Sequence, residues 1–154
     1  MEKQLKVSAI KDGTVLDHIP ADQLFNVIEI LGLSKSLKQI TFGTNLDSKL
    51  LGKKGIIKIA DKYFEDDDIN RIALIAPQAK INIIHNFEVV EKRILSIPAK
   101  VKSIVKCMNP KCITNHQQVE TSFTTIFKEE GFELLCHYCE RITDKDHLKI
   151  ISSE

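Results

Sequence analysis

Four cysteines in the last third of the chain constrain its fold more than any other sequence feature. Four residues separate Cys107 from Cys112, two separate Cys136 from Cys139, and twenty-three lie between the two pairs. Two close pairs at this spacing are typical of a tetrahedral metal site in which two tight turns are joined by a hairpin. We therefore predict one structural metal ion, held by all four thiolates, that clamps both ends of a small sheet.

Zinc is the metal that this ligand set favours, although iron in a rubredoxin-like site would use the same four sulfurs. One alternative is that the cysteines are buried as small hydrophobic residues. Another is a nucleophilic cysteine or a mixed ligand set that uses one of the nearby histidines, His116, His137 and His147. Because four thiolates leave no open coordination position, we expect a structural rather than a catalytic site.

The composition excludes several broad classes of protein. The chain has 154 residues with 22 basic and 21 acidic side chains, a net charge of +1, so no overall field draws it to nucleic acid or to an anionic membrane. No stretch approaches the roughly 20 apolar residues of a membrane span, and no apolar signal core follows the first residues. We therefore expect a cytoplasmic protein, and the reducing cytoplasm argues against disulfides between the cysteines.

The composition changes at residues 96–99, where Pro98 marks a joint. All four cysteines and three of the five histidines follow this proline. We predict two domains, residues 1–97 and residues 98–154. The second is too short to be comfortably stable alone, so its metal binding and its folding are expected to be one event.

The first domain has the pattern of a split β-α-β unit. Runs of β-branched and apolar residues predict strands at residues 5–10, 39–45, 55–60, 80–84 and 87–90. Between them we predict a turn at residues 12–13, a loop at residues 47–54 and a break at His85-Asn86, a dipeptide that favours a turn. Apolar residues at helical spacing predict one helix from Leu24 to Leu31 and another from Asp66 to Ala76. If residues 80–90 count as one interrupted strand, the order is the β-α-β-β-α-β of ferredoxin-like folds, an α+β domain with an antiparallel sheet and two helices on one face.

A sheet covered on one face leaves the other face bare, which favours a pocket or a partner there. Its exposed edge strands also favour pairing between copies of the chain. We therefore expect self-association.

The second domain reads as a small all-β module. Residues 121–127 and 131–135 predict a hairpin between the two cysteine pairs. A zinc-ribbon adaptor that binds nucleic acid or a polymerase is the rival function for this half. Its eight basic and eight acidic side chains, with no basic stripe interleaved with aromatic residues, argue against contacts along a phosphate backbone. We expect a module that docks on another protein.

Taken together, the domains, the element order and the cysteine spacing resemble the regulatory chains of aspartate carbamoyltransferase over nearly the full length. The most specific match is the run Gly-Thr-Val-Leu-Asp-His-Ile-Pro at residues 13–20. Further matches are residues 7–11, 40–41, 52–54, 57–59, 76–79 and 86–90, with Asn45, Asn82 and Ile84. The chain departs from the family pattern at Ser8, where an acid is common, and at Phe87, where tyrosine is common.

The resemblance implies a chain without catalytic activity that binds CTP as an inhibitor and ATP as an activator, with UTP as a further candidate, in pyrimidine biosynthesis. It implies one structural zinc ion per chain and, as partners, a second regulatory chain and the catalytic chain, in a dodecamer of six catalytic and six regulatory chains. Nucleic acid and membranes are not expected partners. Carried over to matching positions, the nucleotide-binding residues would be Ala9, Ile10, Val15, Asp17, His18, Lys54, Ile56, Lys58, Asn82, Ile84, Phe87, Val89 and Lys92.

Overall fold

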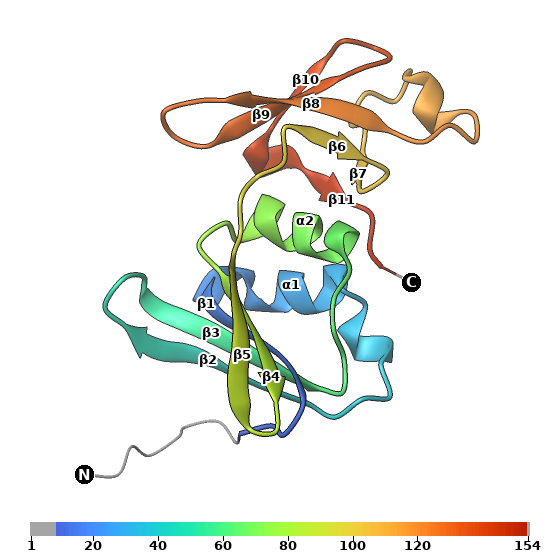
Figure 1. Cartoon of the computed structure of the whole chain (residues 1–154). Helices are drawn as coiled ribbons and strands as arrows, with labels where there is room; N and C mark the ends of the chain where they lie inside the picture. Colours follow the sequence, from blue (N-terminus) through green and yellow to red (C-terminus); the bar gives the residue numbers. More distant parts are fainter. Residues whose placement is uncertain (1–8, 154) are drawn as a thin grey trace. The chain divides into compact units, whose positions relative to one another are not determined.

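The computed structural model describes residues 9–153, and the chain forms two compact units. The first unit ends at Ser96 and the second begins at Ile97. The first combines a five-stranded sheet with two helices, whereas the second consists of short strands and 3-10 turns (Figure 1). Within the described residues, no helix is long and apolar enough to cross a membrane.

The first unit is an antiparallel sheet with both helices on one face (Figure 1). Along the chain its elements are β1 (Gly13–Pro20), α1 (Leu24–Ile30), β2 (Ile40–Ser48), β3 (Gly52–Ala60), α2 (Asp66–Ile75), β4 (Lys80–His85) and β5 (Glu88–Ile94). The 3-10 turns Ala21–Gln23 and Leu33–Lys35 flank α1. The strand order is β2-β3-β1-β4-β5, and every neighbouring pair is antiparallel. The predicted α+β fold with a ferredoxin-like element order is confirmed, and β5 adds a fifth strand at the edge.

Alternation of side chains along the strands gives the sheet one buried and one open face. Leu16 on β1 lies opposite Ile57 on β3 and Ile81 on β4, and each of the three is at most 1% exposed. Val27 of α1 and Ile72 of α2 are fully buried as well. The apolar stripes of the helices therefore pack on this face, and the opposite face of the sheet remains available for a ligand.

Both predicted helices are present with the expected ends. Three acidic residues form the first turn of α2, where negative charge interacts favourably with the helix dipole. The helix ends at Ile75, and the Ala76 N–H still donates to the Ile72 carbonyl at 2.7 Å. Pro77 follows and cannot continue the helix.

The first predicted strand, residues 5–10, is tested only at its last two residues, which form no strand. Residues 5–8 of that strand lie outside the described residues, residues 9–12 form no strand, and β1 begins at Gly13, where the sequence predicts a turn. Gly13 has a φ of 138°, and a Cβ at this position would lie 2.1 Å from the carbonyl oxygen of Ile59. The glycine is therefore required by its close approach to β3 and not by a reversal of the chain.

Two predicted connections are also corrected. Most of residues 47–54 belongs to strands, because β2 extends to Ser48 and β3 begins at Gly52. The predicted break at His85-Asn86 is confirmed as a turn, but residues 80–94 form the hairpin β4–β5 and not one interrupted strand, because Asn86 and Phe87 adopt φ values of 53° and 67° and reverse the chain. Side chains alternate in the same way along one interrupted strand and along the two strands of a hairpin, so periodicity does not distinguish the two arrangements.

The second unit is all-β, as predicted. Its four-stranded sheet has the order β10 (Ile142–Asp144), β9 (Phe132–Cys136), β8 (Ser122–Phe127) and β6 (Lys100–Lys102). A separate pair joins β7 (Val105–Lys106) to β11 (Lys149–Ile150), and the 3-10 turns are Ile113–Asn115 and Lys145–His147. The predicted hairpin between the cysteine pairs is confirmed as β8–β9.

Candidate metal centre and ligand-binding face

The four cysteine sulfurs converge in the second unit. The Sγ atoms of Cys107 and Cys139 lie 3.6 Å apart, those of Cys112 and Cys136 lie 3.8 Å apart, and all four lie within 4.8 Å of one another. Sulfurs bound at about 2.3 Å from the centre of a tetrahedron are separated by about 3.8 Å. The cluster therefore has the dimensions of a four-thiolate metal site, and all four cysteines are free of disulfides.

Hydrogen bonds to the backbone hold the two cysteine loops in shape. Asn115 donates through Nδ2 to the carbonyl oxygen of Cys107 at 2.9 Å and to that of Asn109 at 2.8 Å. In the second loop, the Glu140 N–H donates to the Cys136 carbonyl at 3.0 Å, with Glu140 itself at a φ of 59°. Asn115 is a supporting residue that cysteine spacing alone does not reveal.

The four thiols do not ionise with equal ease. Burial raises the pKa of Cys107 to about 12 and also raises the pKa of Cys136. At Cys139 burial acts in the same direction, but hydrogen bonds with the Asn109 side chain and the Arg141 backbone outweigh it and lower the pKa to about 7. A metal cation would supply the positive charge that the buried thiols need in order to lose their protons.

The nearby histidines make other contacts. His116 Nε2 lies 2.7 Å from the Pro110 carbonyl oxygen, and His147 Nδ1 lies 2.6 Å from Asp144 Oδ1. Among residues 9–153, the one group of side chains arranged as possible metal ligands consists of the four cysteines. The donor set therefore fits a closed structural site.

The open face of the sheet in the first unit carries a row of side chains drawn from four strands. Val15 on β1 lies opposite both Lys58 on β3 and Asn82 on β4, and Asn82 lies opposite Lys92 on β5. Opposed residues of antiparallel strands project to the same side. Four residues of the predicted nucleotide site, far apart in the sequence, are thus aligned across the sheet.

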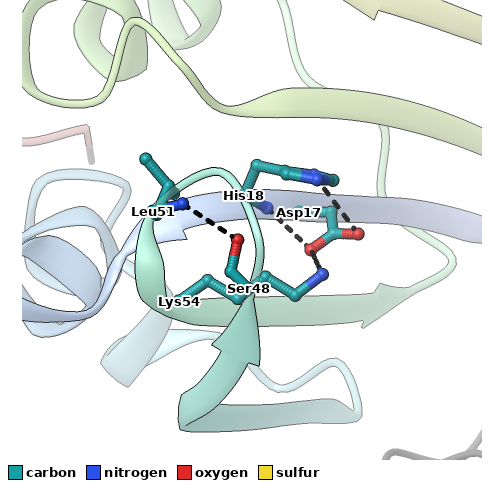
Figure 2. Close-up of polar contacts among 5 residues, drawn as sticks. All are labelled: Asp17, His18, Ser48, Leu51 and Lys54. Carbon is teal, nitrogen blue, oxygen red and sulfur yellow. Dashed lines mark hydrogen bonds and ion pairs between the residues drawn. The ribbon is translucent and has the colours of Figure 1, made fainter.

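Asp17, His18 and Lys54 form a charged group where β1 bulges (Figure 2). Lys54 Nζ lies 2.9 Å from Asp17 Oδ1, and the same oxygen accepts the His18 backbone N–H at 2.7 Å. His18, at a φ of 58°, places its Nδ1 3.5 Å from Asp17 Oδ2. That nitrogen is buried and has no hydrogen-bond partner among the described residues, so the carboxylate of Asp17 is its nearest polar contact.

Lys58 is a buried cation on the open face. Only 8% of the residue is exposed, and this burial lowers the pKa of the lysine, an effect that the carboxylate of Asp17 partly offsets. Burial without full compensation penalises the charged form. An anionic ligand would therefore interact more strongly with Lys58 than with a solvated lysine.

The other predicted nucleotide-binding residues lie around this row. Ile84 on β4 is buried and lies opposite Val89 on β5. Ile56 is half-buried on β3, two residues before Lys58. Ala9 is exposed and Ile10 is half-buried, both in an irregular segment, whereas Phe87 is 65% exposed in the β4–β5 turn.

Two further residues on the same face were not among the nucleotide-binding residues predicted from the sequence. Thr41 on β2 lies opposite Lys58, and Lys80 on β4 lies opposite Asp17. No local pattern distinguishes them from solvated strand residues, because only the register of the strands brings them to this face.

The fold and the two sites define an α+β protein of two units, one with a four-cysteine centre and one with a cationic open sheet face. The family described as aspartate carbamoyltransferase regulatory chain, allosteric domain, matches residues 5–96, and the metal binding domain of the same chain matches residues 99–149. The chain belongs to the regulatory chains of aspartate carbamoyltransferase, with an allosteric domain followed by a metal-binding domain.

Curated relatives carry the same description. The aspartate carbamoyltransferase regulatory chain of Phocaeicola vulgatus is 51% identical over 150 residues, which cover 97% of this chain and 96% of that relative. The chain from Bacteroides fragilis is 52% identical over 97% of both proteins. That from Pyrococcus horikoshii is 47% identical over 147 residues, 94% of this chain and 96% of the relative. All three are named as the regulatory and not the catalytic chain of the enzyme.

Proposed function

We propose that the first unit binds a nucleoside triphosphate on its open sheet face, with CTP as inhibitor, ATP as activator and UTP as a further candidate. The observation that carries this proposal is the alignment of Lys58, Val15, Asn82 and Lys92 across four strands. Two lysines at fixed separation on one sheet face provide the positive charge that suits a polyphosphate.

Each end of the nucleotide has suitable chemistry available. Lys58, Lys92 and Lys54 provide point charges for the phosphates. Asp17 accepts hydrogen bonds from ribose hydroxyls or an exocyclic amine, and the imidazole of His18 beside it offers a further polar contact. For the base, backbone groups would come from Ala9, Ile10 and Ile84, and apolar contacts from Val15, Ile56, Phe87 and Val89.

We infer that the second unit holds one structural zinc ion through Cys107, Cys112, Cys136 and Cys139. The zinc stabilises the two cysteine loops without taking part in a reaction, because a four-thiolate site is closed. Met108, Ile113 and Tyr138 lie on or beside these loops and are 44–48% exposed. Large apolar side chains held on rigid loops suit docking on the catalytic chain of aspartate carbamoyltransferase.

Self-association of the first unit completes the proposed assembly. Phe25 on α1 and Phe42 on the edge strand β2 are 61% and 47% exposed, and their rings stack edge to face with centroids 5.8 Å apart. An exposed aromatic pair beside an open sheet edge suits a second copy of the same chain. Dimers that each dock on two catalytic trimers lead to six catalytic and six regulatory chains, a cytoplasmic complex of pyrimidine biosynthesis.

Regulation then requires that the nucleotide distinguishes two quaternary states. A ligand shifts such an equilibrium only through unequal affinity for the two states, and a typical coupling is about 1–3 kcal/mol. CTP and ATP share the triphosphate contacts and differ at the base. Their opposite effects therefore depend on the residues at the base end.

Thermal melting tests the proposal. Adding CTP or ATP should raise the melting temperature, and the increase should grow with the ratio of ligand concentration to dissociation constant. DNA or RNA should not bind in a filter assay. Co-purification with the catalytic chain should succeed and should be lost after chelation of the metal. Nucleic-acid binding without nucleotide stabilisation would instead support the zinc-ribbon adaptor.

A further inference from the structure

The β4–β5 turn holds a large aromatic side chain in a backbone conformation that suits glycine. Asn86 and Phe87 form a two-residue connection between His85 and Glu88, and both have positive φ, 53° and 67°. Asparagine tolerates this region, but a bulky residue such as phenylalanine rarely adopts it, and glycine is preferred at the second position of such turns. The conformation of Phe87 is therefore strained and must be held by its surroundings.

Residues 11 and 12 hold this turn. The Asn86 N–H donates to Asp12 Oδ1 at 3.1 Å, and the Phe87 N–H donates to the Lys11 carbonyl at 2.8 Å. Asp12 is itself fixed, because its carbonyl oxygen accepts the Asp61 N–H at 3.0 Å. The two N–H groups of the strained turn thus both donate to the short segment of residues 11 and 12, and Asp12 lies 74 residues away from Asn86 in the sequence.

Side chains reinforce the same junction. His85 Nδ1 lies 3.6 Å from Asp12 Oδ1 and 3.2 Å from the hydroxyl of Tyr63, whose ring stacks on the imidazole at a centroid distance of 5.3 Å. The Tyr63 hydroxyl also lies 3.4 Å from the Ile84 carbonyl. The cluster therefore joins the segment before β1, the segment after β3 and the end of β4, and it contacts Ile84 and Phe87, two residues assigned to the base end of the nucleotide site.

We propose that Asp12 is a positioning residue for base recognition: it holds the strained Asn86–Phe87 turn so that the exposed Phe87 ring contacts the base of the bound nucleotide. This inference rests on the proposed nucleotide site. No ligand contact of Asp12 itself is required. At the phosphate end, Lys58 lies on β3, outside the hairpin, and Lys92 lies opposite Asn82, several paired positions away from the turn.

Three ligands and three variants of the full chain test this proposal by titration calorimetry. Asp12→Ala removes the acceptor for Asn86, so the dissociation constants of CTP and ATP should rise about fivefold or more. Inorganic tripolyphosphate, which has no base, should bind within about twofold of the wild-type value. Asp12→Asn keeps an oxygen acceptor and should restore CTP affinity, and Asp47→Ala, at an exposed carboxylate of the same unit, should leave all three ligands unchanged.

The variant Phe87→Gly separates the effect of backbone strain at residue 87 from the contribution of the phenylalanine ring to base recognition. Glycine adopts this φ without penalty, so the variant should melt no lower than wild type, bind CTP more weakly and keep its affinity for tripolyphosphate. Adding Asp12→Ala to Phe87→Gly should cause no further loss of CTP affinity. If Asp12→Ala alone fails to fold, the double variant still tests the proposal, because a turn with glycine at position 87 does not need the hydrogen bond to Asp12.

Several results would overturn the proposal. These are unchanged CTP affinity in Asp12→Ala, an equal loss of tripolyphosphate binding, failure of Asp12→Asn to restore affinity, or a double variant that does not fold. Amide hydrogen exchange at Asn86, which should be protected in wild type and Asp12→Asn but not in Asp12→Ala, reports on the anchor without any ligand. If wild type binds neither CTP nor tripolyphosphate, the proposed function fails with the base assignment, and the exchange data show separately whether the anchor exists.

Discussion

Lys58 combines a buried position with a positive charge on the open face of the first unit. Lys58 is 8% exposed on the open face, and its burial lowers the pKa of its ammonium group. The carboxylate of Asp17 partly offsets this effect. The proposed triphosphate provides negative charge at this position. Burial of Lys58 therefore lowers the stability of the free chain and raises its affinity for the nucleotide.

Lys58→Met should separate these two effects. Binding of CTP at neutral pH should weaken about tenfold or more, because the phosphates lose a poorly solvated cation. The melting temperature of the free chain should not fall, because methionine keeps the buried stem without its charge. Calorimetry and thermal melting check this, with the exposed Lys53 as control in Lys53→Met. A large drop in stability with unchanged CTP binding would contradict it.

The same lysine predicts the direction of a pH effect. Because its folded pKa lies below the unfolded value of 10.5, the folded state binds fewer protons between these two values. The contribution to the free energy of unfolding is therefore greatest above pH 10.5 and falls as the pH drops through the lowered pKa. Alkaline denaturation of wild type and Lys58→Met should differ in this window, and identical slopes would refute the assignment.

Gly13 is the glycine whose replacement the structure opposes most strongly. An alanine Cβ would lie 2.1 Å from the Ile59 carbonyl oxygen, at a backbone φ of 138°. We expect Gly13→Ala to lower the free energy of unfolding by about 3 kcal/mol or more, since β1 and β3 must separate. Gly52→Ala is the matched control, because its Cβ would meet nothing within 4 Å and only its φ of 79° is strained, at about 1–2 kcal/mol. Urea denaturation measures both, and equal losses would be inconsistent with the close contact.

At the scale of elements, we expect the proposed zinc ion to stabilise the cysteine loops more than the β8–β9 hairpin does. The second unit has fewer than 60 residues, so its core, built around Phe123 and Leu134, is small. Structural zinc supplies about 10–16 kcal/mol in small zinc domains, which exceeds the stability of a module of this size.

Cys112→Ser should therefore unfold the second unit and leave the first unit intact. The expected result is loss of stoichiometric zinc, rapid proteolysis after Ser96 and loss of catalytic-chain binding, with CTP stabilisation retained. Met108→Leu, in the same loop, is the control and should keep the metal. If Cys112→Ser still holds zinc and assembles with the catalytic chain, the four sulfurs do not form the site that we propose.

At the scale of the whole molecule, the proposed self-association depends on the open edge of β2 and on the aromatic pair beside it. Phe25→Asp should weaken self-association about a hundredfold, equivalent to about 3 kcal/mol, because a charge replaces a central aromatic side chain. Aspartate in the first turn of α1 suits the helix dipole, so the fold should survive. Sedimentation analysis measures the change, with Phe127→Asp, an exposed aromatic of the second unit, as control. A variant that stays dimeric would place the interface elsewhere.

The sequence by itself determined the class of the protein. Helical periodicity, the acidic start of α2 and the hairpin between the cysteine pairs are local signals, because each arises from residues a few positions apart. The cysteine spacing led to the four-sulfur cluster for the same reason: two short loops need only one hairpin to meet. The resemblance to the regulatory chains depends on runs such as residues 13–20, which are also local.

Tertiary structure alone decided where the open face lies and which residues share it. Three features depend on how the strands pair: the start of β1 at Gly13, the position of the reversal at Asn86 and Phe87, and the alignment of Lys58 with Lys92. Register is set by contacts between residues distant in the sequence, so neither composition nor periodicity encodes it. Asp12 is the clearest example, because its role depends on a turn 74 residues away.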